Sequence, residues 1–383
     1  MPRSYANPFR YGDLALDEAF TDREAELREL TADLRNGQNV VVFAPRRYGK
    51  SSLVWRAAQQ LVAAGDVLVA QVDLLATPSK EKLAEKLAAS IYDDMAAPGA
   101  RVREKIGALF GGLRITPKIV LDPNTGGVSF GFDAGHAAED VDATLERLLE
   151  LPAQIAADRK TRAALVIDEF QEVVEIDRRL PRLMRAVFQR QPEVAHVYLG
   201  SKRSLMERIF NDDNEPFWRS AKQLELDVIP PELFAPFVER TFAKTDRGID
   251  PARTQRVLEI TRGHPYGTQE LCYFLWEQVP EGFSVTDADL AAALAAVLRS
   301  ENSHFGRIWD KAAKGQRLVL QALARDPAQR ISEEFRRRHN LPGDATVRKA
   351  LRTMADDELV RRADPGYRIA EPFFAEWILR YES

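Results

Sequence analysis

The stretch from Asn39 to Val54, "NVVVFAPRRYGKSSLV", constrains the fold more than any other part of the chain. It opens with a short apolar run rich in β-branched residues, which suits a strand buried on both faces. The loop "PRRYGK" comes next, and "SSLVWRAAQQLVAAG" then has the composition of a helix. A strand, a Gly-Lys-Ser loop and a helix in this order predict a phosphate-binding loop, because the helix directs its amino-terminal N–H groups at the anion.

The residue types in the loop have separate tasks. Gly49 lets the backbone approach a phosphate, Lys50 brings a positive charge to the outer phosphates, and Ser51 offers a ligand to Mg²⁺. The expected nucleotide-binding residues of the loop are Ala44, Pro45, Arg46, Arg47, Tyr48, Gly49, Lys50, Ser51 and Ser52.

Ala44 stands where such loops usually carry their first glycine. If its φ is negative, alanine costs little there; a left-handed backbone would cost about 1–2 kcal/mol. Either cost is small beside a multidentate phosphate site, so we expect the substitution to be tolerated.

A second motif, "ALVIDEF", ends an apolar run in two acids, which is the Walker B arrangement. We expect Asp168 to hold Mg²⁺, directly or through water, and Glu169 to act as general base on the attacking water. In "VYLGSKRSL", Ser201 either senses the γ-phosphate or caps the following helix. Arg203 and Arg219 are candidates for stabilising charge in the transition state, with Arg219 as the expected arginine finger.

Strands and helices alternate over the first 229 residues. Buried strands are predicted near 39–44, 66–73, 163–169 and 195–201, and a fifth strand at 223–229. A capping box of Thr21 and Glu24 opens a helix before the first of them. This alternation predicts an α/β fold with a parallel sheet and right-handed crossovers. Residues 114–135 read as an inserted β-hairpin with its turn at 123–127, a surface feature of no assigned function.

Strand signals stop after residue 229. Residues 230–300 read as a small helical lid domain, and residues 301–383 give three helices and a hairpin whose turn is Asp364-Pro365-Gly366. That order is typical of a winged helix-turn-helix. The predicted domains are therefore 1–229, 230–300 and 301–383.

Composition excludes several other classes of protein. No window approaches the roughly 18 apolar residues of a membrane span, so we expect a cytoplasmic protein with no membrane partner. The single cysteine, Cys272, lies in an apolar run, excludes an intramolecular disulfide and is expected in the core. The five histidines have no ligand spacing, so a protein-bound transition metal is not expected.

Together these motifs resemble the archaeal-type P-loop ATPases, relatives of the STAND, AAA+ and origin-recognition ATPases. The resemblance rests on "NPFRYG", "PRRYGKSSL", "VIDEFQE", "GSKRSLMERIF", "ITRGHPYGTQELC" and "YRIAEPFFAEWI", and it spans nearly the whole chain. It implies ATP or ADP with Mg²⁺, and a strand order of 5-1-4-3-2. It also implies that Asn7, Pro8 and Phe9 close over the adenine, and that Gly263, His264 and Pro265 form a second sensor. Ser51 stands where threonine is common in the family.

The client of such an ATPase is open. Our first hypothesis is a nucleotide-controlled switch that acts on a protein partner and is reset by hydrolysis. The alternative is duplex DNA bound by Arg348, Lys349 and Arg352 of a recognition helix, with Arg361, Arg362 and Arg368 on the wing; residues 301–383 carry 16 Lys and Arg against 13 Asp and Glu. A third hypothesis is a non-hydrolysing nucleotide-binding protein. A homo-oligomer is expected if Arg219 acts across subunits.

Overall fold

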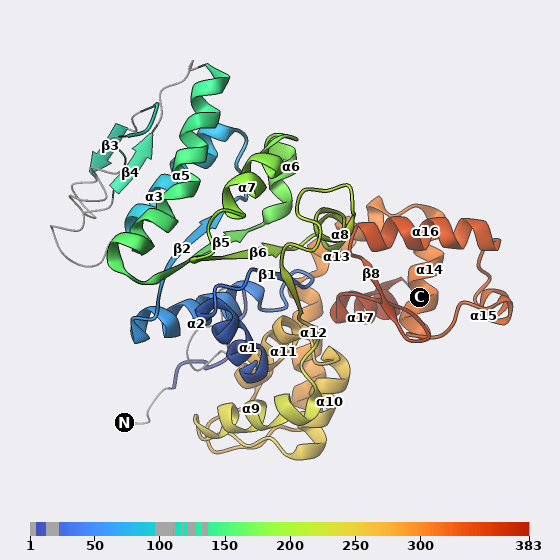
Figure 1. Cartoon of the computed structure of the whole chain (residues 1–383). Coiled ribbons are helices and arrows are strands. Elements are labelled where there is room, and N and C mark those ends of the chain that lie inside the picture. The colour runs from blue at the N-terminus through green and yellow to red at the C-terminus, as the bar shows by residue number, and fades with distance from the viewer. Residues whose placement is uncertain are drawn as a thin grey trace. The chain divides into compact units, whose positions relative to one another are not determined.

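The structure is a computed structural model that describes residues 5–12, 23–95, 110, 112–115, 118–121, 128–131 and 137–382. The chain divides into two compact units. The sheet unit comprises Arg23–Arg46 and Lys50–Leu226, and the helical unit comprises Met1–Asp22, Arg47–Gly49 and Asp227–Ser383. Figure 1 colours both units along the chain, and each is described by itself below.

Five parallel strands form the centre of the sheet unit. They are β1 (Val40–Phe43), β2 (Val67–Asp73), β5 (Arg162–Asp168), β6 (Val194–Gly200) and β7 (Lys222–Glu225). Their order is β2-β5-β6-β1-β7, which confirms the predicted order and fold class. All residues of β1 and β6 are buried, as expected for central strands covered on both faces.

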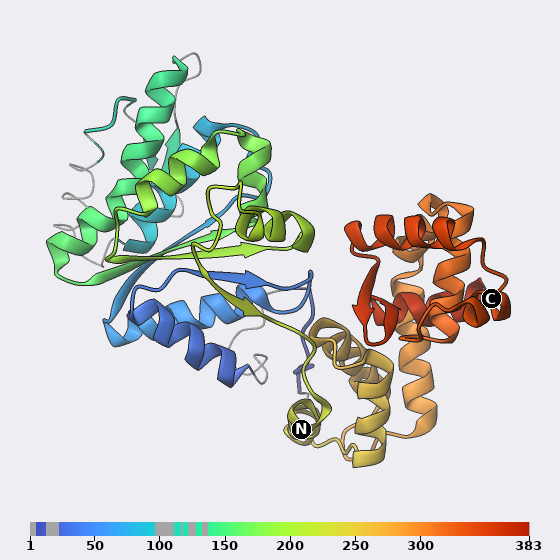
Figure 2. The same ribbon diagram turned by 45° about the vertical axis from the view of Figure 1, so that its right-hand side comes forward.

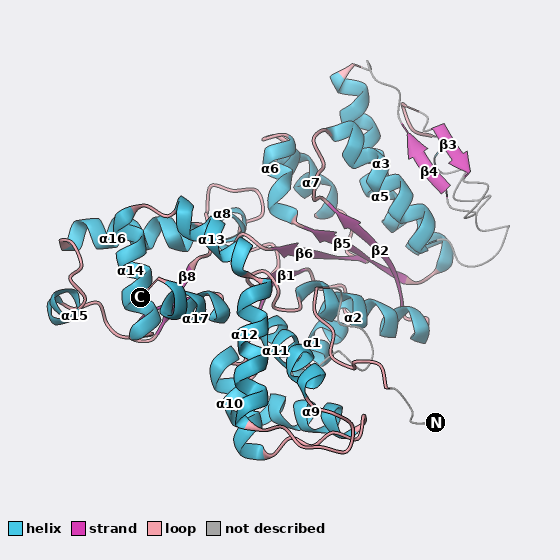
Figure 3. Ribbon diagram, turned by 180° about the vertical axis from the view of Figure 1, so that it is seen from behind, coloured by secondary structure: helices cyan, strands magenta, loops and turns pink. Residues whose placement is uncertain are grey.

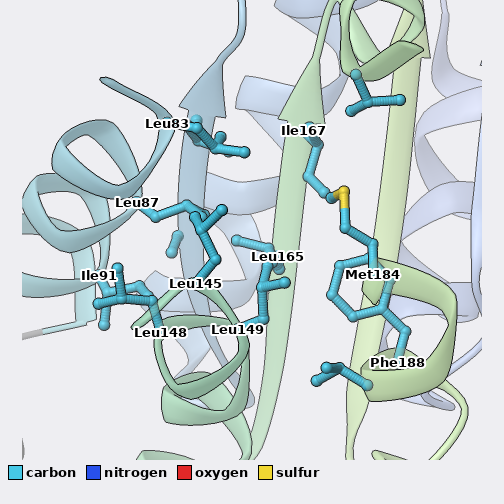
Figure 4. Close-up of a cluster of buried hydrophobic side chains, with 14 of the residues drawn as sticks. Leu83, Leu87, Ile91, Leu145, Leu148, Leu149, Leu165, Ile167, Met184 and Phe188 are labelled. Carbon is cyan, nitrogen blue, oxygen red and sulfur yellow. The ribbon is translucent and has the colours of Figure 1, made fainter. Parts of the chain in front are cut away.

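Helices cover both faces of this sheet. In Figure 2, α1 (Glu24–Arg35) and α2 (Lys50–Ala64) lie on one face. The other face carries α3 (Lys80–Met95), α5 (Ala138–Arg159) and α7 (Leu180–Phe188), whose apolar side chains meet those of β5 in one buried cluster. Figure 4 shows Leu87, Leu145 and Leu165 within this cluster, with Met184 and Phe188 nearby. The helix spacing of leucines in α3 and α5 therefore marks their sheet-facing sides.

The structure describes some of the features predicted within residues 1–229 only in part. The hairpin is present as the antiparallel strands β3 (Lys118–Leu121) and β4 (Val128–Gly131), while its predicted turn at 123–127 lies outside the described residues. Thr21 also lies outside them, so its capping box is not described. The last strand, β7, ends at Glu225 and not at 229, and the backbone N–H of Ile229 donates to Gly263 in the helical unit.

Residues 230–300, predicted as a small helical lid domain, contain four helices. These are α9 (Pro231–Ala243), α10 (Pro251–Thr261), α11 (Pro265–Gln278) and α12 (Asp287–Ser300). Cys272 is fully buried on α11, as expected. Figure 3 shows how little strand this part of the chain contains.

A winged helix-turn-helix follows. Its helices are α13 (Asn302–Lys311), α14 (Lys314–Arg325), α15 (Glu333–Arg338), α16 (Asp344–Asp356) and α17 (Pro372–Tyr381), and its wing is the antiparallel pair β8 (Val360–Ala363) and β9 (Gly366–Ile369). One continuous hydrophobic cluster runs from α9 through α17, so the four helices and the winged helix share a core. Among the described residues, no helix is long and apolar enough to cross a membrane.

Candidate functional site

The strands β1, β5 and β6 are neighbours in the parallel sheet, so their carboxyl ends meet at one edge. The loop after β1 leads to Lys50 and Ser51 at the start of α2. Asp168 ends β5, Glu169 follows it, and Ser201 follows β6. Fold topology alone thus gathers the side chains that the sequence singled out.

The loop after β1 contains two residues with left-handed backbone. The φ angles of Arg47 and Gly49 are 66° and 82°, and left-handed residues of this kind occur in loops whose backbone N–H groups bind anions. Ala44 is not among the left-handed residues, so its methyl group causes no strain. Lys50 is 7% exposed, and its Nζ donates to the carbonyl oxygens of Ala44 at 2.9 Å and Pro45 at 3.1 Å.

Ser51 and Asp168 form the second contact of the site. Ser51 Oγ donates to Asp168 Oδ2 at 2.8 Å, across 117 residues of sequence. Burial raises the pKa of Asp168, the hydrogen bond from Ser51 opposes this, and the charges of Glu169 and Asp73 add to the rise. A hydroxyl and a carboxylate oxygen at this spacing fit a hard cation such as Mg²⁺, which takes oxygen ligands and completes its shell with water and substrate phosphates. A divalent ion there would also offset the crowding of three carboxylates.

Glu169 is held by two donors. Its backbone is left-handed, with φ 52°, and its Oε2 accepts a hydrogen bond from Ser201 Oγ at 2.7 Å. The Nε2 of Gln171 donates to the same oxygen. Helix α8 (Arg203–Asn211) begins after Lys202 and has no side-chain cap, so the alternative of Ser201 as a helix cap is wrong. Our sequence reasoning missed Gln171, although it belongs to the motif "IDEFQ".

The two candidate arginines differ in their surroundings. Arg203 is engaged in ion pairs with Glu207, at 2.7 Å, and with Glu225. Arg219 is exposed, adopts a left-handed φ of 49°, and its guanidinium carbon lies 5.0 Å from the ring centroid of its neighbour Trp218.

Within the helical unit, the loop residues Arg47 and Tyr48 contact side chains from far along the chain. The guanidinium of Arg47 lies 4.2 Å from the ring centroid of Tyr266. Tyr48 is 2% exposed; its ring meets His264 edge to face at 4.7 Å, and the wing residue Arg361 lies 5.5 Å from its centroid. The Nη1 of Arg361 also donates to Asp227 at 2.8 Å.

The predicted second sensor and adenine segment also lie in this unit. His264 is the residue before α11, and its Nδ1 accepts the N–H of Gly267 at 3.1 Å, so this histidine caps the helix that Pro265 begins. Burial, reinforced by Arg361 and Arg47, lowers the pKa of His264 to about 3, and the ring is therefore neutral. Phe9 is 1% exposed and packs against Phe237 and Phe242 in the core, while Pro8 stays partly exposed.

The arginines of the winged helix face in different directions. A groove of about 570 Å³ lies between α16 and the wing, and it is lined in part by Arg330, Arg348, Arg352 and Arg362. Lys349 is not part of this lining, and Arg361 points to Asp227 and Tyr48. Arg348 is paired with Asp344 at 2.7 Å, and the carboxylate partly offsets the positive charge that Arg348 would present to a ligand.

Two family models match the chain. One, described as an ATPase domain predominantly from Archaea, matches residues 20–270, and another, described as a probable winged helix domain, matches residues 303–380. The comparison with curated proteins gave no match.

Solved structures share the fold. The Walker-type ATPase of Pyrococcus abyssi superposes with a TM-score of 0.67 at 16% identity, over 97% of this chain and 99% of its own. The ORC2 protein of Aeropyrum pernix, solved in ADPNP–ADP complexes, superposes with a TM-score of 0.57 at 12% identity, over 98% of this chain and 97% of its own. The match of a family model to residues 20–270, more than half of the chain, means that this chain belongs to the family of ATPases whose domain occurs predominantly in Archaea.

Proposed function

We propose that the protein is a Mg²⁺-dependent ATPase. The observation that supports this proposal is the 2.8 Å contact between Ser51 Oγ and Asp168 Oδ2 at the end of the loop after β1, because two oxygen atoms at this spacing would suit a cation that also binds phosphate. Lys50 would exchange its loop carbonyls for the outer phosphates of ATP. Ser51 and Asp168 would hold the Mg²⁺, which supplies charge stabilisation for the transferred phosphoryl group.

Glu169 is the proposed general base. It would take a proton from a water as the water oxygen bonds to the γ-phosphorus, while the bond from that phosphorus to the bridging oxygen of ADP breaks. Ser201, already on the Glu169 carboxylate at 2.7 Å, would sense the γ-phosphate or its water. Arg219 is a better candidate than Arg203 for stabilising charge, since Arg203 is bound by two glutamates. Arg219 could serve the site of its own chain or that of a second copy of the chain.

In the proposed nucleotide site, the segments at residues 7–9 and 263–265 have supporting roles. The side chain of Asn7 donates to the carbonyl of Tyr273 at 3.1 Å, which fixes the start of the segment on α11. Phe9 is buried in the core. Of Pro8 and Phe9, we therefore expect Pro8 to contact the adenine. His264 would sense the phosphates as a neutral imidazole, since its pKa is about 3.

We further propose that the ATPase works as a nucleotide-controlled switch on a protein partner. The support is the contact of the wing residue Arg361 with Tyr48 and Asp227 inside the helical unit. Tyr48 belongs to the phosphate loop by sequence and to the helical unit by its packing. A change in the loop on nucleotide binding would therefore alter the environment of the wing. ATP and ADP would favour different arrangements only to the extent that they bind them with different affinity.

Steady-state hydrolysis of ATP with Mg²⁺, and with excess EDTA, tests the proposed activity. Wild-type protein should release phosphate only with Mg²⁺. Lys50→Ala should weaken nucleotide binding about 100-fold, the order expected when charged hydrogen bonds are lost. Lys82→Ala is the matched control, because Lys82 is an exposed residue of α3 whose ammonium pairs with Glu85 of the same helix. Turnover unaffected by EDTA or by Lys50→Ala would refute the proposal.

Duplex DNA is a second candidate ligand, favoured by the arginine-lined groove between α16 and the wing. Its test is the anisotropy of a labelled random duplex at several salt concentrations, together with ATP turnover with and without the duplex. If the groove binds DNA, affinity should fall steeply with salt, and Arg352→Ala should weaken it. Lys349→Ala is the control, because Lys349 lies on the same helix but does not line the groove. Affinity that does not change with salt, or equal losses of affinity in both variants, would exclude this groove as the DNA-binding site.

A further inference from the structure

The carboxylate of Glu169 is hydrogen-bonded unevenly. Both of its side-chain donors, Ser201 Oγ and Gln171 Nε2, bond to the single oxygen Oε2. Within the part of the chain that the structure describes, no side-chain hydrogen bond falls on Oε1. One oxygen is therefore held in place while the other keeps its lone pairs for a water molecule.

The side chain of Gln171 is held in place by its surroundings. It is 1% exposed and lies in η2 (Phe170–Glu172), the short helix that starts directly after the left-handed Glu169. A methyl group on Gly200 would come within 2.6 Å of Gln171 Oε1. The amide therefore packs against the end of β6 at a position where only glycine leaves enough room. The tight turn at Glu169 and the glycine at 200 together fix the amide beside the carboxylate.

The other end of the same amide has no partner. Gln171 Oε1 is buried without a hydrogen bond, which is a costly state for a polar atom. Methionine has a similar size and would avoid this cost, so packing alone does not explain a glutamine here. Which end of the amide carries nitrogen follows from the neighbour, because a carboxylate oxygen can only accept. The amide is explained by what its N–H group does for Glu169.

We propose that Gln171 is a positioning residue for hydrolysis. With Ser201 it clamps Oε2 of Glu169, so that Oε1 is the oxygen that receives the proton of the attacking water. This inference rests on the proposed ATPase activity and assigns Gln171 no contact with the nucleotide. It predicts that loss of the N–H donor lowers kcat and leaves nucleotide affinity unchanged, since a base held in the wrong rotation slows only the chemical step.

The test compares Gln171→Met and Gln171→Glu with the wild type. Single-turnover rates are measured with saturating ATP and Mg²⁺ between pH 5.5 and pH 8.5, along with ADP affinity and the melting temperature. Gln171→Met should lower the rate about 100-fold, with ADP affinity within about twofold of wild type. Gln171→Glu places a carboxyl group where the amide was, and that group can donate only when protonated. The rate of Gln171→Glu relative to Gln171→Met should therefore rise as the pH falls.

The outcomes of this test distinguish the positioning role of Gln171 from the proposed ATPase activity. An active wild type together with a fully active Gln171→Met would overturn the positioning role alone. A ratio of the two variants that is constant with pH would also overturn it, because a purely structural defect has no reason to follow the protonation of the new carboxyl group. A wild type without Mg²⁺-dependent turnover would overturn the proposed ATPase, and the positioning role with it.

Discussion

The carboxylates at the sheet edge are buried in a different way from those of Glu270 on α11 and of Glu371, the residue before α17. At the sheet edge, Asp168 and Glu169 each accept hydrogen bonds from neighbouring side chains. In the helical unit, Glu270 is 1% exposed, and both it and Glu371 keep a buried oxygen without a partner. Burial raises the pKa of Glu270 to about 8 and that of Glu371 to about 7. The difference shows that the first region supplies side-chain hydrogen-bond donors to its carboxylates, whereas the second favours protonated ones.

The largest effect on stability should come from adding a methyl group at the sheet edge, where Gly200 ends β6. In Gly200→Ala the new methyl group would lie 2.4 Å from the Met206 side chain and 2.6 Å from Gln171 Oε1. We expect a loss of about 1–3 kcal/mol in the free energy of unfolding, measured by urea denaturation, and a lower rate of ATP hydrolysis. The matched control is Gly306→Ala in α13, where a methyl group meets nothing within 4 Å. That change should stabilise the protein by about 0.5–1 kcal/mol. Equal effects of the two variants would contradict this packing at β6.

Protonation should affect the second region next. The pKa of Glu270 is about 8 in the folded protein, against 4.5 for a glutamate in water, so the folded state binds the proton more tightly between those values. Stability should therefore fall as the pH rises through that window, by on the order of 1 kcal/mol per pH unit from this group. Glu270→Gln should flatten the profile and raise the melting temperature most at pH 8. A melting profile that keeps its slope in Glu270→Gln would disprove the assignment.

A smaller effect should separate the two faces of the wing. Arg361 lies on Tyr48 and Asp227, whereas its neighbour Arg362 lines the groove. Arg361→Ala should change nucleotide affinity by a few fold, since a partly exposed ion pair contributes up to about 1 kcal/mol. Arg362→Ala should leave it unchanged. Titration with a fluorescent ADP analogue measures both, and identical affinities would mean that the wing does not influence the loop.

The smallest effect concerns the loop residue that departs from its motif. Ala44 is not left-handed, so restoring glycine relieves no strain. Ala44→Gly should leave nucleotide affinity within about twofold of wild type, because only backbone flexibility changes. A gain of tenfold or more, by the same titration, would show that the methyl group obstructs the phosphate.

Much of the fold and part of the site follow from sequence patterns. Apolar runs rich in β-branched residues located the buried strands, and the motif order brought Ser51, Asp168, Glu169 and Ser201 to one sheet edge. These succeed because strand burial and parallel order are encoded locally and by chain direction.

The rest depends on contacts that patterns do not encode. Gln171 reaches Glu169 only because Glu169 turns left-handed, which no residue type at that position signals. Strand alternation predicts that Arg361 and Arg362 lie on opposite faces of the wing, but which of the two meets Tyr48 depends on how β8 packs. Phe9 was expected at the nucleotide, and its burial between Phe237 and Phe242 depends on packing across more than 200 residues.

The most direct test of the account is a paired measurement on Glu169→Gln, with ATP affinity in one experiment and single-turnover hydrolysis in the other. The amide keeps the size of the carboxylate and can still accept from Ser201 and Gln171, but it cannot take a proton. We expect ATP affinity to match the wild type and the hydrolysis rate to fall about 10²–10⁴-fold, the range for loss of a general base. A Glu169→Gln protein that hydrolyses ATP at the wild-type rate would contradict the assignment of this site as the catalytic centre.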